Sequence, residues 1–351
     1  MSDTAASVST AHIAPNRGTA SGEPSGQWRP ARKFPESYPG ECPPGHYLLH
    51  DGAVSELVET ADAARYAVVT ATGREPLDAY LSRLGAPLLA QRYPVLAYGA
   101  NRNPATLDIK LLNYRYDAPP GGRCIPILAG TLADADVVAC GIHGQGYYYG
   151  ELLWRGELSR DVVLDVRVCL LDRDQLRVLN DSEGLRDGLY SAARIPGVRI
   201  PGLPGSVTPL GYVADAYVWV SPQYGMPLGF SMLPATGRRI PALTTGEIMR
   251  HVLDTLDLRS AVHAVTGLAD DETLPTELTK YLNGQWWYQF NTGDTPIRGY
   301  RAVLELVDAA MAGGTLASRT RDHLEKAGLL IPTDLAYEPD ASLTLAGTDG
   351  G

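Results

Sequence analysis

The stretch Leu179–Tyr190 reads Leu-Asn-Asp-Ser-Glu-Gly-Leu-Arg-Asp-Gly-Leu-Tyr, and it separates two elements that the sequence predicts with different periods. A helix is predicted before it, over 172–179, because Leu176 and Leu179 recur at helical spacing. Asp172 is suited to cap the N-terminus of that helix. A strand is predicted after the stretch, over 190–195. The stretch therefore predicts a helix, a sharp turn and a strand.

Glu183 lies at the point where the predicted helix ends. Gly184 and Gly188 follow it, and glycines allow the chain to turn sharply between the helix and the strand. A carboxylate in this position can be directed into a cleft. On this stretch alone, a solvated residue in the last turn of the helix is the simpler interpretation.

Length and composition restrict the class of protein. The chain has 351 residues, 44% of them hydrophobic, so it can form one large domain or two small ones with a sizeable core. The formal net charge is -10 and no cluster of Lys and Arg interrupts this acidic balance. Nucleic acid and anionic membranes are therefore disfavoured as main partners.

The cysteines and the N-terminus indicate the compartment. The four cysteines are scattered without a Cys-x-x-Cys pair, a pattern that favours reduced thiols over a disulfide or zinc framework. Residues 1–25 lack a basic start followed by an apolar run, and no apolar stretch is long enough to span a bilayer. We expect a soluble, cytoplasmic protein with no metal or organic cofactor, because no His/Cys ligand spacing is present.

The composition of the sequence divides the chain into four segments. Residues 1–45 are rich in small and turn-forming residues and are predicted to be a disordered tail. Residues 46–235 form the main domain, residues 236–336 a helical C-terminal extension, and residues 337–351 a loose tail. Apolar periodicity and capping patterns predict helices over 78–91, 105–112, 244–256, 300–311 and 316–327.

The predicted strands alternate with helices in no repeating order. Short apolar or β-branched runs are expected to form strands over 95–98, 162–171, 190–195 and 212–220. Because no βαβ repeat connects them, the sequence predicts an α+β fold with a mostly antiparallel or mixed sheet.

A second motif precedes the Glu183 segment. Residues 95–101 read Val-Leu-Ala-Tyr-Gly-Ala-Asn, a short apolar strand that runs directly into a glycine turn. Such a turn exposes consecutive backbone N–H groups, which together can hold a carboxylate.

In order and sequence, these motifs resemble the gamma-glutamylcyclotransferase-like family. That family has a strand ending in Tyr-Gly-Ser-Asn and, further along, a catalytic Glu followed by Gly. Here the motifs read Tyr98-Gly99-Ala100-Asn101 and Asp181-Ser182-Glu183-Gly184. The Gly188-Leu189-Tyr190 and Ser221-Pro222-Gln223-Tyr224 segments are similar to two further family elements that place tyrosines at the substrate pocket.

The resemblance covers residues 93–235 and implies a fold and an activity. The implied fold is a gamma-glutamylcyclotransferase-like mixed β-barrel with flanking helices. The implied reaction is intramolecular attack of an α-amine on a γ-glutamyl amide, which releases 5-oxoproline and an amine or amino acid. Glu183 would be the general acid/base, and no cofactor is needed.

The resemblance also assigns binding roles. The backbone of Gly99 to Asn101 would hold the substrate α-carboxylate or the developing oxyanion, and Tyr190 and Tyr224 would donate hydrogen bonds or form the pocket wall. Ala100 replaces the family's Ser, which is harmless if the backbone does the binding and alters recognition if the hydroxyl takes part.

Two other functions stay open at this point. One is a ligand-binding or interaction protein that kept the fold without turnover. The other is an enzyme of the same fold that acts on another amide or small acid.

Four features outside these motifs have two interpretations each. His143 is a surface loop residue or lines the pocket, and Glu151 faces solvent from a strand or tunes substrate preference. Tyr147 to Tyr149 pack a strand or form a stacking platform. The aromatic run Trp286 to Phe290 attaches the C-terminal helices to the main domain, lines the cleft, or contacts another protein.

Overall fold

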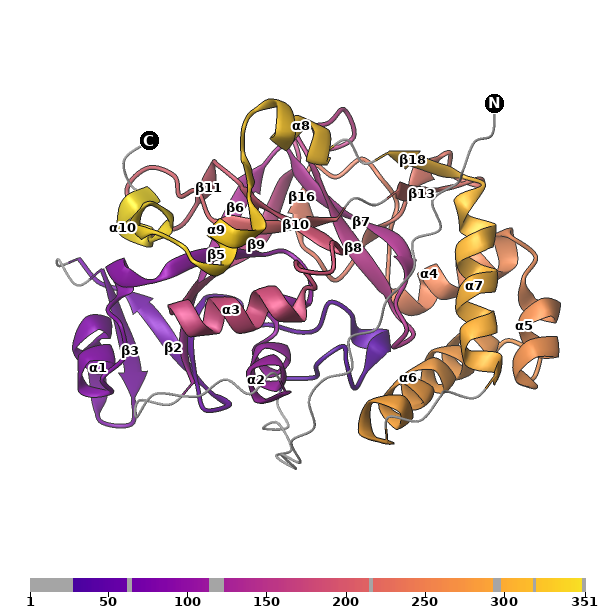
Figure 1. Cartoon of the computed structure of the whole chain (residues 1–351), viewed down its shortest axis with the longest axis horizontal. Coiled ribbons are helices and arrows are strands. Elements are labelled where there is room, and N and C mark those ends of the chain that lie inside the picture. Colours follow the sequence, from indigo (N-terminus) through magenta and orange to yellow (C-terminus); the bar gives the residue numbers. More distant parts are fainter. Residues whose placement is uncertain are drawn as a thin grey trace.

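The computed structural model describes residues 28–61, 65–113, 123–214, 217–292, 298–317 and 320–348. Figure 1 shows a mixed α+β protein in which helices cover both sides of large β-sheets. The α+β class and the mostly antiparallel pairing predicted from the sequence are confirmed.

A 12-stranded sheet forms the centre of the fold. Its main path runs in the order β19 (Leu330–Ile331), β10 (Tyr190–Arg194), β12 (Leu210–Ala214), β5 (Tyr93–Ala97), β9 (Val163–Leu171), β6 (Cys124–Ala133), β1 (His46–His50), β2 (Ala53–Glu59), β3 (Tyr66–Thr70) and β4 (Gly73–Pro76). β11 (Val198–Arg199) pairs with β6, and β16 (Ala235–Thr236) pairs with β9. Neighbours are antiparallel except β12 and β5. Within the described residues this path is open, so a closed barrel is not observed.

Two smaller sheets complete the β structure. One has the order β17 (Ala242–Leu243), β15 (Gly229–Phe230), β7 (Ala135–Ile142) and β8 (Tyr148–Trp154). The other has the order β14 (Met226–Pro227), β13 (Tyr217–Ser221) and β18 (Thr315–Ala317).

The helices fall along the whole chain. They are η1 (Pro35–Ser37), α1 (Leu77–Arg83), η2 (Leu89–Gln91), η3 (Ala100–Arg102), α2 (Pro104–Asn113), α3 (Arg173–Ser182), α4 (Thr245–Thr255), α5 (Arg259–Thr266), α6 (Leu274–Thr292), α7 (Arg298–Ala312), α8 (Thr320–Lys326), α9 (Thr333–Tyr337), η4 (Ala341–Leu343) and α10 (Leu345–Thr348).

Strand β5 separates two hydrophobic clusters, because successive side chains of a strand point to opposite faces. Val95 and Ala97 pack in the cluster that includes Leu107 of α2 and Leu176 of α3. Leu96, with residues of the β7–β8 sheet, α4, α6 and α7, belongs to the other cluster. The central sheet thus lies between α2 and α3 on one side and the second sheet with the C-terminal helices on the other (Figure 1).

Several predicted boundaries were wrong. The expected helix over 78–91 is α1 followed by η2; α1 ends before Gly85, which has a positive φ of 70°, and Pro87 separates the two helices. The expected strand over 212–220 is two strands, β12 and β13, and residues 215–216 lie outside the described part. The expected helix over 316–327 begins as β18, and its helical part is α8.

The tails are more ordered than the sequence predicts. Residues 1–27 and 349–351 lie outside the described residues. Residues 28–45 are placed on the core, where Ala31 and Tyr38 are buried. At the other end Leu343 and Leu345 are buried, and the Leu345 N–H donates to Arg92 O over 2.8 Å. Short segments without periodicity are thus held here by burial of single side chains.

The C-terminal extension is not purely helical. Its strand β18 pairs with β13, and its strand β19 pairs with β10, so the extension is part of two sheets. Both strands have three residues or fewer, which is too short for a periodic sequence pattern. The four cysteines are free. Among the described helices, none has the length and apolar character needed to span a membrane.

Candidate functional site

The turn after β5 presents Asn101. Strand β5 ends at Ala97, and the first main-chain hydrogen bond of the following turn runs from the Arg102 N–H to Gly99 O over 3.1 Å. The N–H groups of Gly99, Ala100 and Asn101 therefore precede the first bond of this 3-10 turn. A Cβ at Gly99 would lie 3.0 Å from the hydroxyl oxygen of Tyr38, so a larger residue here would press on that side chain.

The C-terminal end of α3 presents Glu183. Asp172 caps the helix as predicted, and its carboxylate accepts the Gln175 N–H while Gln175 bonds back to the Asp172 N–H. Glu183 is the C-terminal cap, and Gly184 after it has a positive φ of 67°. The glutamate and the glycine turn are where the sequence predicts them, and the helix runs to Ser182, three residues beyond the predicted end at 179.

The two sequence motifs meet at a hydrogen bond. Asn101 Nδ2 donates to Glu183 Oε1 over 2.9 Å, although the two residues are 82 positions apart. Lys110 of α2 joins them: its Nζ donates to Asn101 Oδ1 over 2.8 Å and also to Glu183 Oε1. A carboxylate, an amide and an ammonium group thus form one connected cluster.

Lys110 is the residue that the sequence interpretation missed. Its side chain is only 7% exposed, and that of Glu183 is 14% exposed. A signal for it exists in the sequence, since Lys110 is the one cation of the predicted helix over 105–112 and stands between Ile109 and Leu111. A lone cation among buried positions needs a partner, because an unpaired buried charge is strongly unfavourable.

The pKa of Glu183 reflects two opposed influences. Burial raises it, but the Lys110 ammonium group and the hydrogen bonds from Lys110 and Asn101 lower it below its ordinary value, with a smaller contribution from Arg32. Burial lowers the pKa of Lys110, while Glu183 opposes this effect and Arg32 adds to it. The Glu183 carboxylate is therefore held in its charged form.

Five tyrosines interact electrostatically with Glu183. Burial raises the pKa of each, and the Glu183 charge raises it further; they are Tyr38, Tyr98, Tyr147, Tyr190 and Tyr212. Their hydroxyls stay protonated at neutral pH and act as hydrogen-bond donors rather than as bases. Tyr98 and Tyr190, both expected at the site, are among them.

Three of these hydroxyls are engaged in the fold. Tyr98 donates to Tyr212 O over 2.5 Å, Tyr212 donates to Asn180 Oδ1 over 2.8 Å, and Tyr147 donates to Gln145 Oε1 over 3.1 Å. The Tyr38 oxygen accepts the Gly150 N–H over 2.9 Å. Within the described part of the chain, no acceptor is bonded to the hydroxyls of Tyr38 and Tyr190, so both can donate to a ligand.

Tyr224 does not join this cluster. It is 42% exposed and stacks on His251 of α4, with ring centroids 5.2 Å apart. Its N–H bonds to Ser221, whose hydroxyl oxygen lies 2.7 Å from His251 Nε2. The contacts that the structure gives Tyr224 are thus with the β13–β14 hairpin and α4, and the expectation that it forms the wall of the Glu183 pocket finds no support in them.

The structure shows the surroundings of Glu151, His143 and Tyr147, which have two interpretations each from the sequence. Glu151 is fully buried, with its Oε2 accepting the Ala214 N–H over 3.2 Å, so the simpler solvent-facing interpretation was wrong. His143 is partly buried and stacks on Tyr147, with centroids 4.7 Å apart, and Tyr38 also stacks on Tyr147 at 4.7 Å. The three rings form a continuous stack, and the charge of Glu183 raises the pKa of the two tyrosines in it.

Within the described residues, neither a metal site nor the depression between β6 and the segment 199–205 involves the Glu183 cluster. The described residues contain no group of three or more His, Cys, Asp or Glu side chains that could hold a metal ion. An open depression of about 450 Å³ lies elsewhere, between β6 and the segment 199–205, with Asp165 and Arg199 in its lining. Its lining includes none of the candidate catalytic residues, so it does not bear on the Glu183 chemistry.

Comparisons with known proteins add little. No protein-family model matches the sequence, and a search of curated proteins also finds no match. A solved structure that is similar in part is titled "Ensemble refinement of the crystal structure of uncharacterized protein loc79017 from Homo sapiens". It is 17% identical, the match covers 38% of this chain and 74% of that one, and the TM-score is 0.26. A likeness at this TM-score does not assign a fold or a function.

Proposed function

We propose that this protein is a gamma-glutamylcyclotransferase-like enzyme that converts a γ-glutamyl amide into 5-oxoproline and a free amine or amino acid. The observation that carries the proposal is the hydrogen bond between Asn101 and Glu183, because it joins the two separate motifs that the family resemblance pairs. The specific fold of that family, a mixed β-barrel with flanking helices, is part of the same proposal.

The reaction needs little beyond positioning and proton transfer. The α-amine of a γ-glutamyl group attacks its own γ-carbonyl carbon and closes a five-membered ring, and the amide C–N bond then breaks. Holding the two groups in contact contributes on the order of 7–11 kcal/mol to the acceleration. The attacking ammonium must lose a proton, and the departing amine must gain one, so one carboxylate can serve both steps.

Glu183 fits this double role, with one energetic requirement. An α-amino group has a pKa of about 8, whereas that of Glu183 lies below its ordinary value of 4.5. Transfer of the proton to Glu183 therefore costs at least about 5 kcal/mol, from 3.5 units at 1.36 kcal/mol each. This cost offsets a substantial part of the gain from positioning, and Lys110 adds to it because it lowers the carboxyl pKa.

The remaining groups are assigned by their hydrogen-bonding capacity. The N–H groups of Gly99, Ala100 and Asn101 are proposed to hold the α-carboxylate or the developing oxyanion. Recognition through these N–H groups explains why Ala100 can stand where the family has Ser. The Tyr190 hydroxyl is proposed to donate to the reacting carbonyl or the departing amine.

Glu183→Gln tests the proposal, because glutamine has nearly the same shape but cannot accept a proton. We expect the wild type to release 5-oxoproline from at least one member of a panel of γ-glutamyl peptides and amines, as measured by mass spectrometry. The folded variant is expected to lose this activity. Equal turnover in the two proteins would rule out Glu183 as the general acid/base.

The alternative is a ligand-binding protein without turnover, and the Lys110–Glu183 ion pair is the observation that favours it. An ion pair satisfies the carboxylate in the free protein, which is also how a purely structural glutamate is held. Under this alternative no panel member yields 5-oxoproline, although a γ-glutamyl compound still binds. Turnover of another amide without 5-oxoproline release would instead indicate a same-fold enzyme with a different substrate.

A further inference from the structure

A chain of buried side chains links the two elements that carry Asn101 and Glu183. The Tyr98 hydroxyl donates to Tyr212 O over 2.5 Å, and the Tyr212 hydroxyl donates to Asn180 Oδ1 over 2.8 Å. Tyr98 stands three residues before Asn101. Asn180 likewise stands three residues before Glu183. Strand β12 therefore holds the turn after β5 through the carbonyl of Tyr212, and it holds the end of α3 through the hydroxyl of the same residue.

Asn180 forms hydrogen bonds with three separate parts of the structure. Its Oδ1 accepts the Tyr212 hydroxyl of β12, and its Nδ2 donates to Ala336 O of α9 over 2.9 Å. Its main-chain oxygen accepts the N–H of Leu185, in the turn after Glu183, over 3.2 Å. The side chain is fully buried. A buried polar group with its partners in place holds its surroundings in one arrangement, so Asn180 fixes the last turn of α3.

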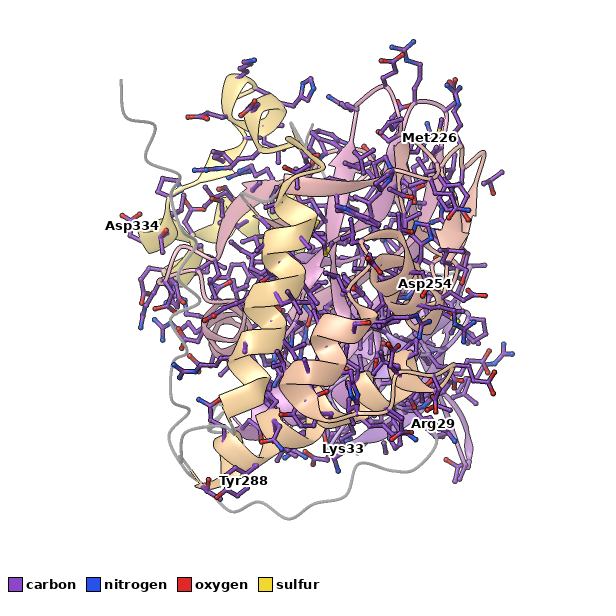
Figure 2. The ribbon with its side chains drawn as sticks, turned by 90° about the vertical axis from the view of Figure 1, so that its right-hand side faces the viewer. Arg29, Lys33, Met226, Asp254, Tyr288 and Asp334 are labelled. Atoms are coloured by element: carbon purple, nitrogen blue, oxygen red, sulfur yellow. The ribbon has the colours of Figure 1, made fainter. Side chains whose placement is uncertain are left out.

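Helix α9 brings the C-terminal extension into this arrangement. It packs on α3 and β10, and Figure 1 shows it in yellow next to α3. The buried Tyr337 of α9 donates its hydroxyl to Asp181 Oδ1 over 2.7 Å, and Tyr337 O accepts the Arg177 Nε–H over 3.2 Å. Asp334 of α9 is exposed, and Figure 2 shows it at the edge of the molecule. The buried part of α9 thus contacts the helix that presents Glu183.

The position of Glu183 depends on how the end of α3 is held. Glu183 follows the last helical residue, Ser182, and the glycine turn begins directly after it at Gly184. Glycine allows many backbone conformations, so the helix end rather than the turn sets the position of the carboxylate. The bond from Asn101 Nδ2 to Glu183 Oε1 measures 2.9 Å, and such bonds weaken beyond roughly 3.2 Å. Contacts at the helix end therefore bear on the chemistry, because in catalysis a misplacement of about 1 Å can lower the rate about 100-fold.

We propose that Asn180 is a positioning residue, which fixes the end of α3 so that Glu183 meets Asn101. It acts through Tyr212 of β12 and through the Ala336 carbonyl of α9. The inference rests on the proposed function, because it concerns how the carboxylate of the same site is held. Through α9, the C-terminal extension, which lies outside the region of family resemblance, supports the chemistry of that site.

Two variants weaken this arrangement to different degrees. Asn180→Leu keeps a side chain of similar size and removes both of its side-chain hydrogen bonds. Tyr212→Phe removes only the bond from β12 and leaves the main-chain carbonyl of the same residue in place. Arg177→Met is the matched control. Arg177 also lies on α3 and bonds to α9, through Tyr337 O, but it stands six residues before Glu183.

We expect Asn180→Leu to lower kcat roughly 100-fold with little change in KM, because Glu183 is displaced while the groups proposed to hold the substrate stay in place. Tyr212→Phe, which keeps the bond to α9, should lower kcat roughly 10-fold. Arg177→Met should retain the wild-type kcat. Release of 5-oxoproline measures all three, and Tyr212→Phe decides if Asn180→Leu does not fold. Wild-type kcat in Tyr212→Phe, or an equal loss in Arg177→Met, would overturn the proposal.

The pH profile separates positioning from a simple loss of stability. Burial raises the pKa of Glu183, and the contacts with Lys110 and Asn101 lower it. A displaced Glu183 loses part of both contacts but stays buried, so its pKa should rise. The acidic limb of the kcat profile should therefore move to higher pH in Asn180→Leu and keep its wild-type position in Arg177→Met. An unmoved limb in Asn180→Leu would mean that this residue serves stability alone, and the proposal would be wrong.

Failure of the proposed function is separated by a measurement without substrate. If no γ-glutamyl compound is turned over, NMR titration of protein with isotope-labelled glutamate carboxyl groups replaces the kinetics, and the Glu183 signal is assigned by its absence in Glu183→Gln. A raised pKa of Glu183 in Asn180→Leu and Tyr212→Phe, with the wild-type pKa kept in Arg177→Met, would support the positioning role while the cyclotransferase proposal fails. An unchanged pKa in Asn180→Leu, or an equal rise in Arg177→Met, would overturn the positioning role as well.

Discussion

Replacing Lys110 with methionine tests how the site holds its carboxylate. In the wild type, the Lys110 ammonium group bonds to Glu183 and to Asn101 Oδ1, and its side chain is 7% exposed. Methionine fills a similar volume without charge. The Glu183 carboxylate would then be buried, with the Asn101 amide as its remaining hydrogen-bond partner among the residues that the structure describes.

The expected loss of stability is limited by protonation of Glu183. Removing one member of a buried ion pair costs about 3–5 kcal/mol. The carboxyl group can instead take up a proton, which at pH 7 costs about 3.4 kcal/mol, from 2.5 units above its ordinary pKa of 4.5. We therefore expect a loss of about 3 kcal/mol at pH 7.

The loss of stability in Lys110→Met must increase as the pH rises. In the wild type the pKa of Glu183 is lowered, so its stabilising contribution is present above pH 4.5 and disappears as pH falls through the folded-state pKa. In Lys110→Met burial raises that pKa, so the folded state is increasingly disfavoured as pH rises above 4.5. The difference between the two proteins should thus grow by up to about 1.4 kcal/mol per pH unit.

Urea unfolding of both proteins at pH 5, 6, 7 and 8 measures this difference. The control is the double variant Lys110→Met with Glu183→Gln, which removes both charges and should recover most of the stability lost at pH 7. Equal destabilisation at pH 5 and pH 8 would refute the reasoning. So would a double variant no more stable than Lys110→Met.

Three further predictions concern the surroundings of the Glu183 carboxyl group. A left-handed backbone costs alanine roughly 1–2 kcal/mol. Gly184→Ala should destabilise the protein by more than this, because its Cβ would lie 2.6 Å from a leucine side chain. Gly188, with a φ of 71°, has open space around it, so Gly188→Ala should show the backbone cost alone, and thermal unfolding measures both variants. Asn101→Ala removes a hydrogen bond that lowers the carboxyl pKa, so the acidic limb of the pH–rate profile should move to higher pH; an unmoved limb would contradict this. Tyr190→Phe should reduce kcat roughly 100-fold if its hydroxyl stabilises the transition state, whereas Tyr224→Phe should leave kcat unchanged, and 5-oxoproline release measures both.

Local signals in the sequence predicted the elements that carry Asn101 and Glu183. The Asp172 cap and the Thr244 capping box both form as expected, because a side chain three residues from its backbone partner specifies them without help from the rest of the fold. Gly184 likewise takes the positive φ that its position after a helix requires. Interactions within a few residues are therefore the part of this site that sequence analysis can predict.

The ion pair at the centre of the site could not be predicted in this way. Lys110 and Glu183 meet because α2 and α3 pack on the same face of the central sheet, through Leu107, Leu176 and neighbouring apolar residues. That approach depends on tertiary packing across 73 positions of sequence. The sequence shows that Lys110 needs a partner, but not which carboxylate supplies it.

The position of Arg32 could not be predicted from the sequence for a different reason. Its position depends on a main-chain carbonyl that accepts bonds from Asn283 and Trp287, and every residue has such a carbonyl. The segment around it lacks hydrophobic periodicity, so the sequence predicts a disordered tail there. Because any residue can make such a main-chain contact, the residue type at this position does not indicate it.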